Sequence, residues 1–182
     1  MIIASILRQQ TRREHVRTEA VYTDFDLQTL QGYIRFLIAQ ASAGLAVEQS
    51  LESAGVTEVV EDWPDRRRSQ LLRDDLARLN VDGIALQPPR SLGSKTEIMG
   101  AVYVLEGSRL GGNILRKRVY RSAPTRFLDA KAKPGAWKAF LASLETQLPG
   151  KEEIGLAVSA ARGVFATYQA AGLAAAEIQI ER

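Results

Sequence analysis

The sequence contains no cysteine and only one histidine. Without thiols, the chain forms no disulfide, thiolate metal centre, iron–sulfur cluster or cysteine nucleophile. A single histidine also argues against zinc or di-iron sites built from several histidines. No apolar run approaches the roughly 20 residues that span a bilayer, and the first residues do not have the basic flank of a signal peptide. We therefore expect a cytoplasmic protein that does not insert into a membrane.

The composition is that of one globular domain. The chain has 182 residues, of which 46% are hydrophobic and 25% charged, so we expect a single domain over 1–182 with its own core. The formal net charge is +3, which is too weak to argue for nucleic-acid binding. The basic run Arg66-Arg67-Arg68 is interpreted as a solvated helix start, because acidic residues flank it.

The spacing of apolar residues predicts helices and no strand. Proline and glycine pairs mark the connections, and 80–93, which holds Pro88-Pro89, is predicted to be a loop. We expect an all-α chain with helices at about 5–22, 27–55, 63–79, 94–121, 136–148 and 151–177.

The single histidine, His15, lies in a stripe with Leu7, Thr11 and Glu19, which recur every four residues. On a helix these side chains share one face. Arg8 precedes His15 by two turns and is suited to pair with a ligand carboxylate, and Glu19 is suited to hydrogen-bond the second imidazole nitrogen of a metal-bound histidine. The alternative interpretation is an ordinary solvated helix face carrying charge pairs.

A second unusual stretch contains Gly107, Gly111 and Gly112 inside an otherwise helical pattern. Each glycine costs about 1 kcal/mol relative to alanine in a helix interior, so the cluster needs a reason. Gly107 and Gly111 share a face, which lets another surface approach the backbone closely. Tight helix packing or a helix end is the alternative. Together with His15, the cluster suggests a planar ligand, a haem, held between two helices.

Taken together, the two segments resemble the haem oxygenase family. Leu7-Arg8-x-x-Thr11-x-x-x-His15-x-x-x-Glu19 resembles the helix on the proximal side of the haem. The stretch Tyr103-Val104-Leu105-Glu106-Gly107-Ser108-Arg109-Leu110-Gly111-Gly112 resembles the distal helix of the bacterial, biliverdin-producing branch associated with bacteriophytochromes. The resemblance implies an all-α, single-domain helical bundle with haem between the two helices.

The resemblance also implies an activity. Haem would be both substrate and cofactor, and O2 with external electrons would cleave it to biliverdin, carbon monoxide and ferrous iron. The chain has no flavin or dinucleotide motif, so a ferredoxin or an NADPH-dependent reductase is the expected electron donor. A bacterial phytochrome is the expected bilin acceptor, and no nucleic acid or membrane partner is expected. The alternative is a non-catalytic haem sensor or carrier on the same fold.

Site residues carried over by the resemblance fall into three groups. His15 is the expected iron ligand, and Gly107, Ser108 and Gly111 are the expected catalytic group around a distal water. Ser108 stands where many relatives have an aspartate, so the route of proton delivery stays open. The remaining expected haem contacts are Arg8, Thr11, Glu19, Tyr103, Val104, Gly112, Arg162 and Phe165.

Overall fold

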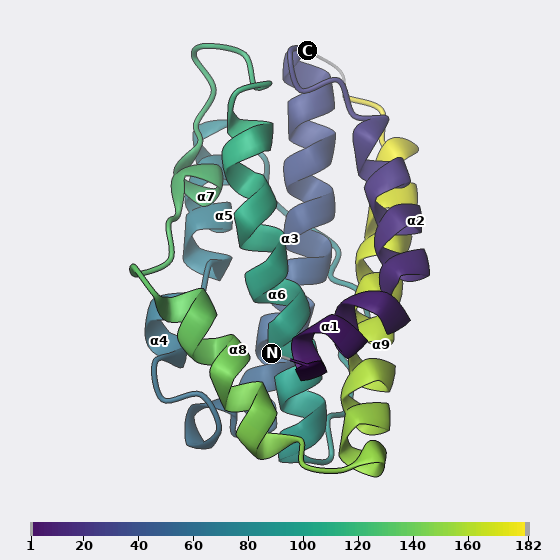
Figure 1. Ribbon diagram of the computed structural model, residues 1–182. Helices are drawn as coiled ribbons and strands as arrows, with labels where there is room; N and C mark the ends of the chain where they lie inside the picture. The colour runs from purple at the N-terminus through teal and green to yellow at the C-terminus, as the bar shows by residue number, and fades with distance from the viewer. Residues whose placement is uncertain (1, 181–182) are drawn as a thin grey trace.

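The computed structural model describes residues 2–180, and every regular element among them is helical (Figure 1). The elements are α1 (Ile2–Gln10), α2 (Arg12–Thr23), α3 (Leu30–Ser53), the 3₁₀ turn η1 (Val56–Glu58), α4 (Trp63–Arg66), α5 (Ser69–Arg78), α6 (Lys95–Arg116), α7 (Arg126–Asp129), α8 (Ala136–Gln147) and α9 (Lys151–Ala176). The all-α prediction is confirmed for these residues.

Three long helices, α3, α6 and α9, form the centre of the bundle, and α2 runs alongside α9 (Figure 1). The closest approach is between α6 and α9, where a Cβ on Gly100 would collide with the carbonyl of Ala157. Glycine is required at this crossing because it lets the two backbones meet. The pair therefore holds α6 firmly in place below the glycine-rich segment.

The first predicted helix is wrong in one respect, because it is two helices that meet at Thr11. The backbone there has φ −107° and ψ 5°, although Thr11 and His15 still donate to the carbonyls four residues earlier. The Thr11 hydroxyl also donates to the Leu7 carbonyl at 2.8 Å, a bond that bends helices. The bend turns α2 away from α1 (Figure 1). Leu7 and Thr11 are buried, whereas His15 is exposed.

The helix predicted over 63–79 is also interrupted, at Arg67, whose backbone is extended (φ −61°, ψ 141°). The reason is tertiary: the carboxylate of Glu48 on α3 accepts from the backbone N–H groups of Arg68 and Ser69 at 2.8 and 3.1 Å. That contact starts α5 as a separate helix. The helix predicted over 94–121 ends at Arg116.

Within residues 2–180, no helix is both long enough and apolar enough to cross a membrane. The longest of them, α9, carries charged residues in its first turn, and buried small side chains line the face that it presents to α3 and α6. Its length is used for packing inside the bundle.

Candidate functional site

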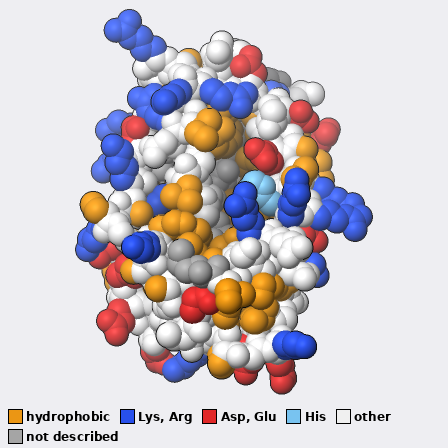
Figure 2. Space-filling view, in the orientation of Figure 1, with side chains coloured by type: hydrophobic (Ala, Val, Ile, Leu, Met, Phe, Trp, Pro, Cys, Tyr) orange, Lys and Arg blue, Asp and Glu red, His pale blue; other side chains and the backbone are white. Residues whose placement is uncertain are grey.

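Figure 2 shows a hollow on the face of the molecule shared by α2 and α6, with the histidine on one wall and hydrophobic side chains across from it. The imidazole of His15 projects from α2, and 61% of its surface is exposed. A helical residue that points into a surface hollow is placed to contact a ligand there. The predicted ligand residue therefore lies in the concave part of the surface.

Two of the residues predicted to contact the ligand, Glu19 and Phe165, lie beside His15. Glu19 follows one turn later, and its Oε2 lies 3.7 Å from Nδ1 of His15. This separation is slightly longer than a direct hydrogen bond, which a small rotation of the Glu19 side chain would form. The ring of Phe165 on α9 meets the imidazole edge-on, with centroids 5.7 Å apart. Phe165 is 9% exposed, so it supports the imidazole from behind.

The α6 wall carries the bare backbone that the sequence predicted. A Cβ on Gly107 or Gly111 would meet nothing within 4 Å. Both residues lie within a continuous helix, so neither glycine marks a helix end. The neighbouring side chains of Leu110 and Ile114 are 52% and 68% exposed. This face of α6 is flat along its glycines and apolar at its side, which suits a planar, largely apolar ligand.

Gly112 is placed differently from the other two glycines. It is buried, and a Cβ there would lie 3.4 Å from the carbonyl oxygen of Leu128 in α7. Its small size serves the packing of α6 on the segment that includes α7. The structure does not bring Gly112 onto the open face with Gly107 and Gly111.

Ser108 connects the open face to a buried charge. Its side chain is exposed, and its Oγ donates to the carbonyl of Leu105 at 2.7 Å. The same Oγ accepts a hydrogen bond from Nη2 of Arg68, also at 2.7 Å. Arg68 is only 7% exposed and also donates to the Leu105 carbonyl at 3.1 Å. Ser108, which stands where many relatives have an aspartate, is therefore hydrogen-bonded to the cation of Arg68.

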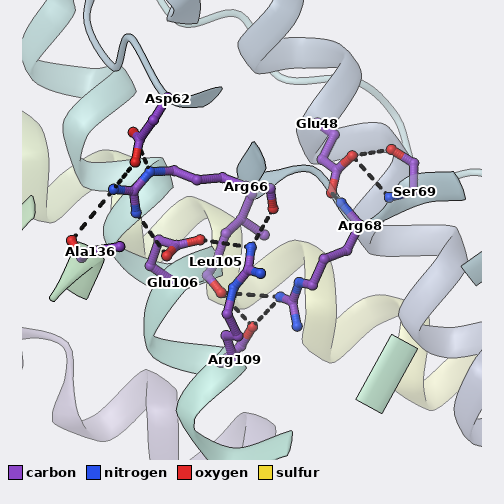
Figure 3. Close-up of polar contacts among 10 residues, drawn as sticks. Glu48, Asp62, Arg66, Arg68, Ser69, Leu105, Glu106, Arg109 and Ala136 are labelled. Atoms are coloured by element: carbon purple, nitrogen blue, oxygen red, sulfur yellow. Dashed lines mark hydrogen bonds and ion pairs between the residues drawn. The ribbon is translucent and has the colours of Figure 1, made fainter. Parts of the chain in front are cut away.

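The interpretation of Arg66-Arg67-Arg68 as a solvated helix start is wrong for two of the three residues. Arg66 and Arg68 are each 7% exposed, and only Arg67 reaches solvent. Arg66 makes ion pairs with Asp62 at 2.6 Å and Glu106 at 2.8 Å, directly behind α6 (Figure 3). Arg109 joins them through Glu106 at 3.1 Å.

Sequence reasoning missed these buried charges because their partners are distant in the chain. One signal was present: Glu48 interrupts an apolar stretch of α3, between Val47 and Leu51. A buried carboxylate demands hydrogen-bond donors, and here it receives three, from the N–H groups of Arg68 and Ser69 and from the Ser69 hydroxyl. The signal indicates that donors exist without saying which residues supply them.

Two further expected contacts, Tyr103 and Arg8, interact with each other. Tyr103 is half-buried, and its ring lies 5.8 Å from that of Trp137. Burial raises the pKa of Tyr103, and the positive charge of nearby Arg8 opposes that rise. Arg8 is exposed close to the tyrosine. The structure therefore brings Arg8, from α1, next to the N-terminal half of the α6 wall.

Three other expected contacts have partners inside the fold. Thr11 is 2% exposed and donates to Leu7, and Val104 is 5% exposed within the main core. Arg162 donates to the Gln10 carbonyl at 2.8 Å, where α1 ends, and lies 3.6 Å from Glu14. In this structure the three residues therefore use their side chains on other parts of the protein, at the α1–α2 junction and in the core.

Comparisons with known proteins bear on the family and the fold of this chain. No protein-family model matches the chain. A haem oxygenase from Xanthomonas campestris pv. campestris is 34% identical over 129 residues, which are 66% of this chain and 76% of that protein. Haem oxygenase from Neisseria meningitidis, crystallised in its NO- and CO-bound forms, superposes with a TM-score of 0.80 over 99% of this chain and 94% of that one. At 20% identity, the second likeness concerns the fold. The chain is an enzyme that belongs to the haem oxygenase family.

Proposed function

We propose that the hollow between α2 and α6 binds haem, and that the enzyme cleaves it to biliverdin, carbon monoxide and ferrous iron with O2 and external electrons. His15 is the iron ligand in this proposal. The observation that carries it is an exposed imidazole at the hollow together with two glycines on α6, each of which borders open space. When bound, haem supplies the iron at which O2 is activated.

The residues of the hollow suit the ligand's chemistry. Neutral imidazole is a good ligand for iron, and a carboxylate that hydrogen-bonds its second nitrogen raises its basicity. Glu19 is within reach of Nδ1, which leaves Nε2 for the metal. Gly107 and Gly111 allow backbone to approach the flat ring, and exposed Arg8 is a cation that could pair with a propionate.

On the α6 side, Ser108 is the side chain placed to hold a proton-donating water. Its Oγ accepts from Arg68 and donates to Leu105, and it keeps one lone pair for a water on the open face. The carboxylate expected at this position in many relatives is replaced by a hydroxyl fixed from behind. In this proposal, proton delivery uses a water at Ser108 Oγ.

The experiment is a titration of the purified protein with hemin, followed by ascorbate or a reductase in air. We expect a stoichiometric Soret band that His15→Ala weakens or shifts, and a subsequent broad red bilin absorption with carbon monoxide release. Val16→Ala is a matched control, because Val16 is the exposed neighbour of His15 on α2. The control should behave as the unaltered protein.

Two results would change the proposal. A stable Soret band without bilin would favour the non-catalytic sensor or carrier. Absence of stoichiometric haem binding would overturn the whole site assignment.

The use of the product is also part of the proposal. The resemblance to sequences associated with bacteriophytochromes supports bilin supply to a bacterial phytochrome. Transfer is checked by mixing the enzyme, hemin and reductant with an apo-phytochrome and following the chromophore's absorption. If the phytochrome gains no chromophore although biliverdin forms, iron acquisition becomes the favoured purpose.

A further inference from the structure

Arg68 is a buried cation without a carboxylate partner. It is 7% exposed, and among residues 2–180 no acidic oxygen lies within ion-pair distance of its guanidinium. Its acceptors in that part of the chain are the Leu105 carbonyl and Ser108 Oγ, and both bonds are made by Nη2. The N–H groups on Nε and Nη1 have no acceptor there. Figure 3 shows the Arg68 guanidinium pointing toward α6, beside Leu105.

The two buried arginines of this segment differ in how their charge is compensated. Arg66 has two carboxylates, Asp62 and Glu106, at hydrogen-bonding distance. Glu48, which is drawn with Arg68 in Figure 3, uses its oxygens on the backbone of Arg68 and on Ser69. A buried charge that lacks a partner is costly. Its retention at the edge of a ligand site points to a role toward the ligand.

The charged and titratable groups that act on Arg68 come from three helices. They are Glu48 on α3, Glu106 and Arg109 on α6, and Tyr168 on α9. Burial lowers the pKa of Arg68, and Arg109 lowers it further, while Tyr168 and the two glutamates oppose the shift. Because a guanidinium stays protonated in proteins, Arg68 carries its charge throughout the working range of pH.

The position of the guanidinium is fixed from three sides. Glu48 holds the backbone N–H of Arg68, the ring of Phe127 lies 4.8 Å from its guanidinium carbon, and α6 accepts its Nη2. A long side chain held in this way has little rotamer freedom left. The positive charge of Arg68 is therefore held at one position, next to Ser108.

We propose that Arg68 is a positioning residue of the haem site: it holds Ser108 and gives the α6 side of the pocket a fixed positive charge that favours anionic ligands there. The inference rests on the proposed function, because it needs haem bound between His15 and α6. In many relatives an acid on α6 organises the polar groups on this side of the haem. The proposal assigns that role to Arg68, which lies between α4 and α5.

The test uses two spectroscopic readouts of the ferric haem complex, neither of which requires turnover. The first is the midpoint pH of the acid–alkaline transition, and the second is the Kd for azide well below that midpoint. Removing the charge with Arg68→Met should raise the midpoint by about one pH unit and weaken azide binding about tenfold. Arg67→Met is the matched control, since Arg67 is half-exposed and pairs with Glu52.

Two further variants keep the test decisive if Arg68→Met does not fold. Arg68→Lys keeps the charge and should leave the midpoint close to that of the unaltered protein. Ser108→Ala keeps Arg68 but removes its acceptor, and should raise the midpoint by a smaller amount. Unchanged midpoints and azide affinities in folded Arg68→Met, or in Ser108→Ala, would overturn the inference.

Failure of the inference is distinguishable from failure of the proposed function. If the unaltered protein binds no hemin, the haem site itself is wrong. If hemin binds through His15 and is converted to bilin while Arg68→Met behaves like Arg67→Met, only the role of Arg68 is wrong. Melting of each variant without hemin reports separately on folding.

Discussion

Gly100 and Gly111 lie on the same helix, but their surroundings are opposite. A Cβ on Gly100 would collide with the Ala157 carbonyl, whereas a Cβ on Gly111 would meet nothing within 4 Å. One glycine is required by packing inside the protein. The other costs helix stability and gains no contact in exchange within residues 2–180, which is expected of a position kept bare for a ligand.

Substitution of these glycines separates the two reasons. Gly111→Ala should stabilise the protein without hemin by up to about 1 kcal/mol, because alanine is the better helix former. Gly100→Ala should destabilise it, because the α6–α9 crossing must open. Urea unfolding of the two variants measures both effects. A destabilising Gly111→Ala would show that this glycine is needed for packing after all.

The same glycine also predicts an effect on the ligand. A larger side chain at the open face, as in Gly111→Leu, should leave folding intact and block the approach of haem to α6. Hemin titration should show at least a tenfold weaker Kd. Leu156→Ala, at an exposed leucine on α9, provides the control for a general change in surface hydrophobicity.

At the scale of elements, the bend between α1 and α2 decides where His15 points. Arg162 on α9 is its external support, because it donates to the Gln10 carbonyl at the end of α1 and lies near Glu14 on α2. The sequence resemblance instead suggested a contact with a haem propionate. The two roles have different consequences for the protein without hemin.

Arg162→Ala distinguishes these roles. If the arginine supports the bend, the variant should lose about 1 kcal/mol of unfolding free energy, since the side chain is half-exposed and its bonds are partly screened. Thermal unfolding without hemin measures this loss. Unchanged stability together with weaker hemin binding would favour the propionate contact.

A second element-scale prediction concerns Asp75, which anchors α7 to α5. Its carboxylate accepts from the backbone N–H groups of Arg126 and Phe127 at 3.1 and 2.9 Å. Burial raises the pKa of Asp75 above its ordinary value, although the two backbone bonds oppose the rise. A raised pKa in the folded state means that the folded protein binds this proton more tightly than the unfolded chain.

The sign of the pH dependence follows from that difference. The contribution of Asp75 to stability is full below its unfolded pKa and declines as the pH rises through the folded value. The Asp75→Asn side chain cannot titrate. The difference in unfolding free energy between the unaltered protein and this variant should therefore narrow from pH 4 to pH 7. Urea unfolding across this range provides the test. A gap that widens with pH would contradict the assigned direction.

At the scale of the whole molecule, the proposed reaction needs electrons, which an external donor protein would supply to the proposed haem site. The exposed face of α2 carries Arg12, Arg13 and Arg17, close to the proposed iron ligand on the same helix. An acidic electron donor would be attracted to this surface, with a strong dependence on ionic strength. We propose the α2 arginines as its docking surface.

Charge reversal tests this surface. Arg12→Glu with Arg13→Glu should raise the KM for a ferredoxin or reductase about tenfold at low salt and leave ascorbate-driven turnover unchanged. Arg73→Glu on α5 together with Lys151→Glu on α9 changes the net charge by the same amount. This control should have little effect on the KM for the donor. Equal donor KM values for the two double variants would argue against docking on α2.

The sequence by itself determined the class of fold, and it supplied the two halves of the proposed site. Apolar spacing of 3.6 residues is a local property, so the long helices and the loop over 80–93 were predictable. His15 and the pair Gly107 and Gly111 were also found from local spacing. Family membership followed from these two motifs and agrees with the Xanthomonas relative.

Only the tertiary structure decided what these segments meet. The bend at Thr11, the break at Arg67, the burial of Arg66 and the contact of Gly112 with Leu128 all differ from the sequence-based expectation. Arg68 and Ser108 are 40 residues apart in the chain and 2.7 Å apart in space. Helical periodicity determines on which face of its own helix a residue lies. Which other helix packs against that face depends on the packing free energy of the whole core.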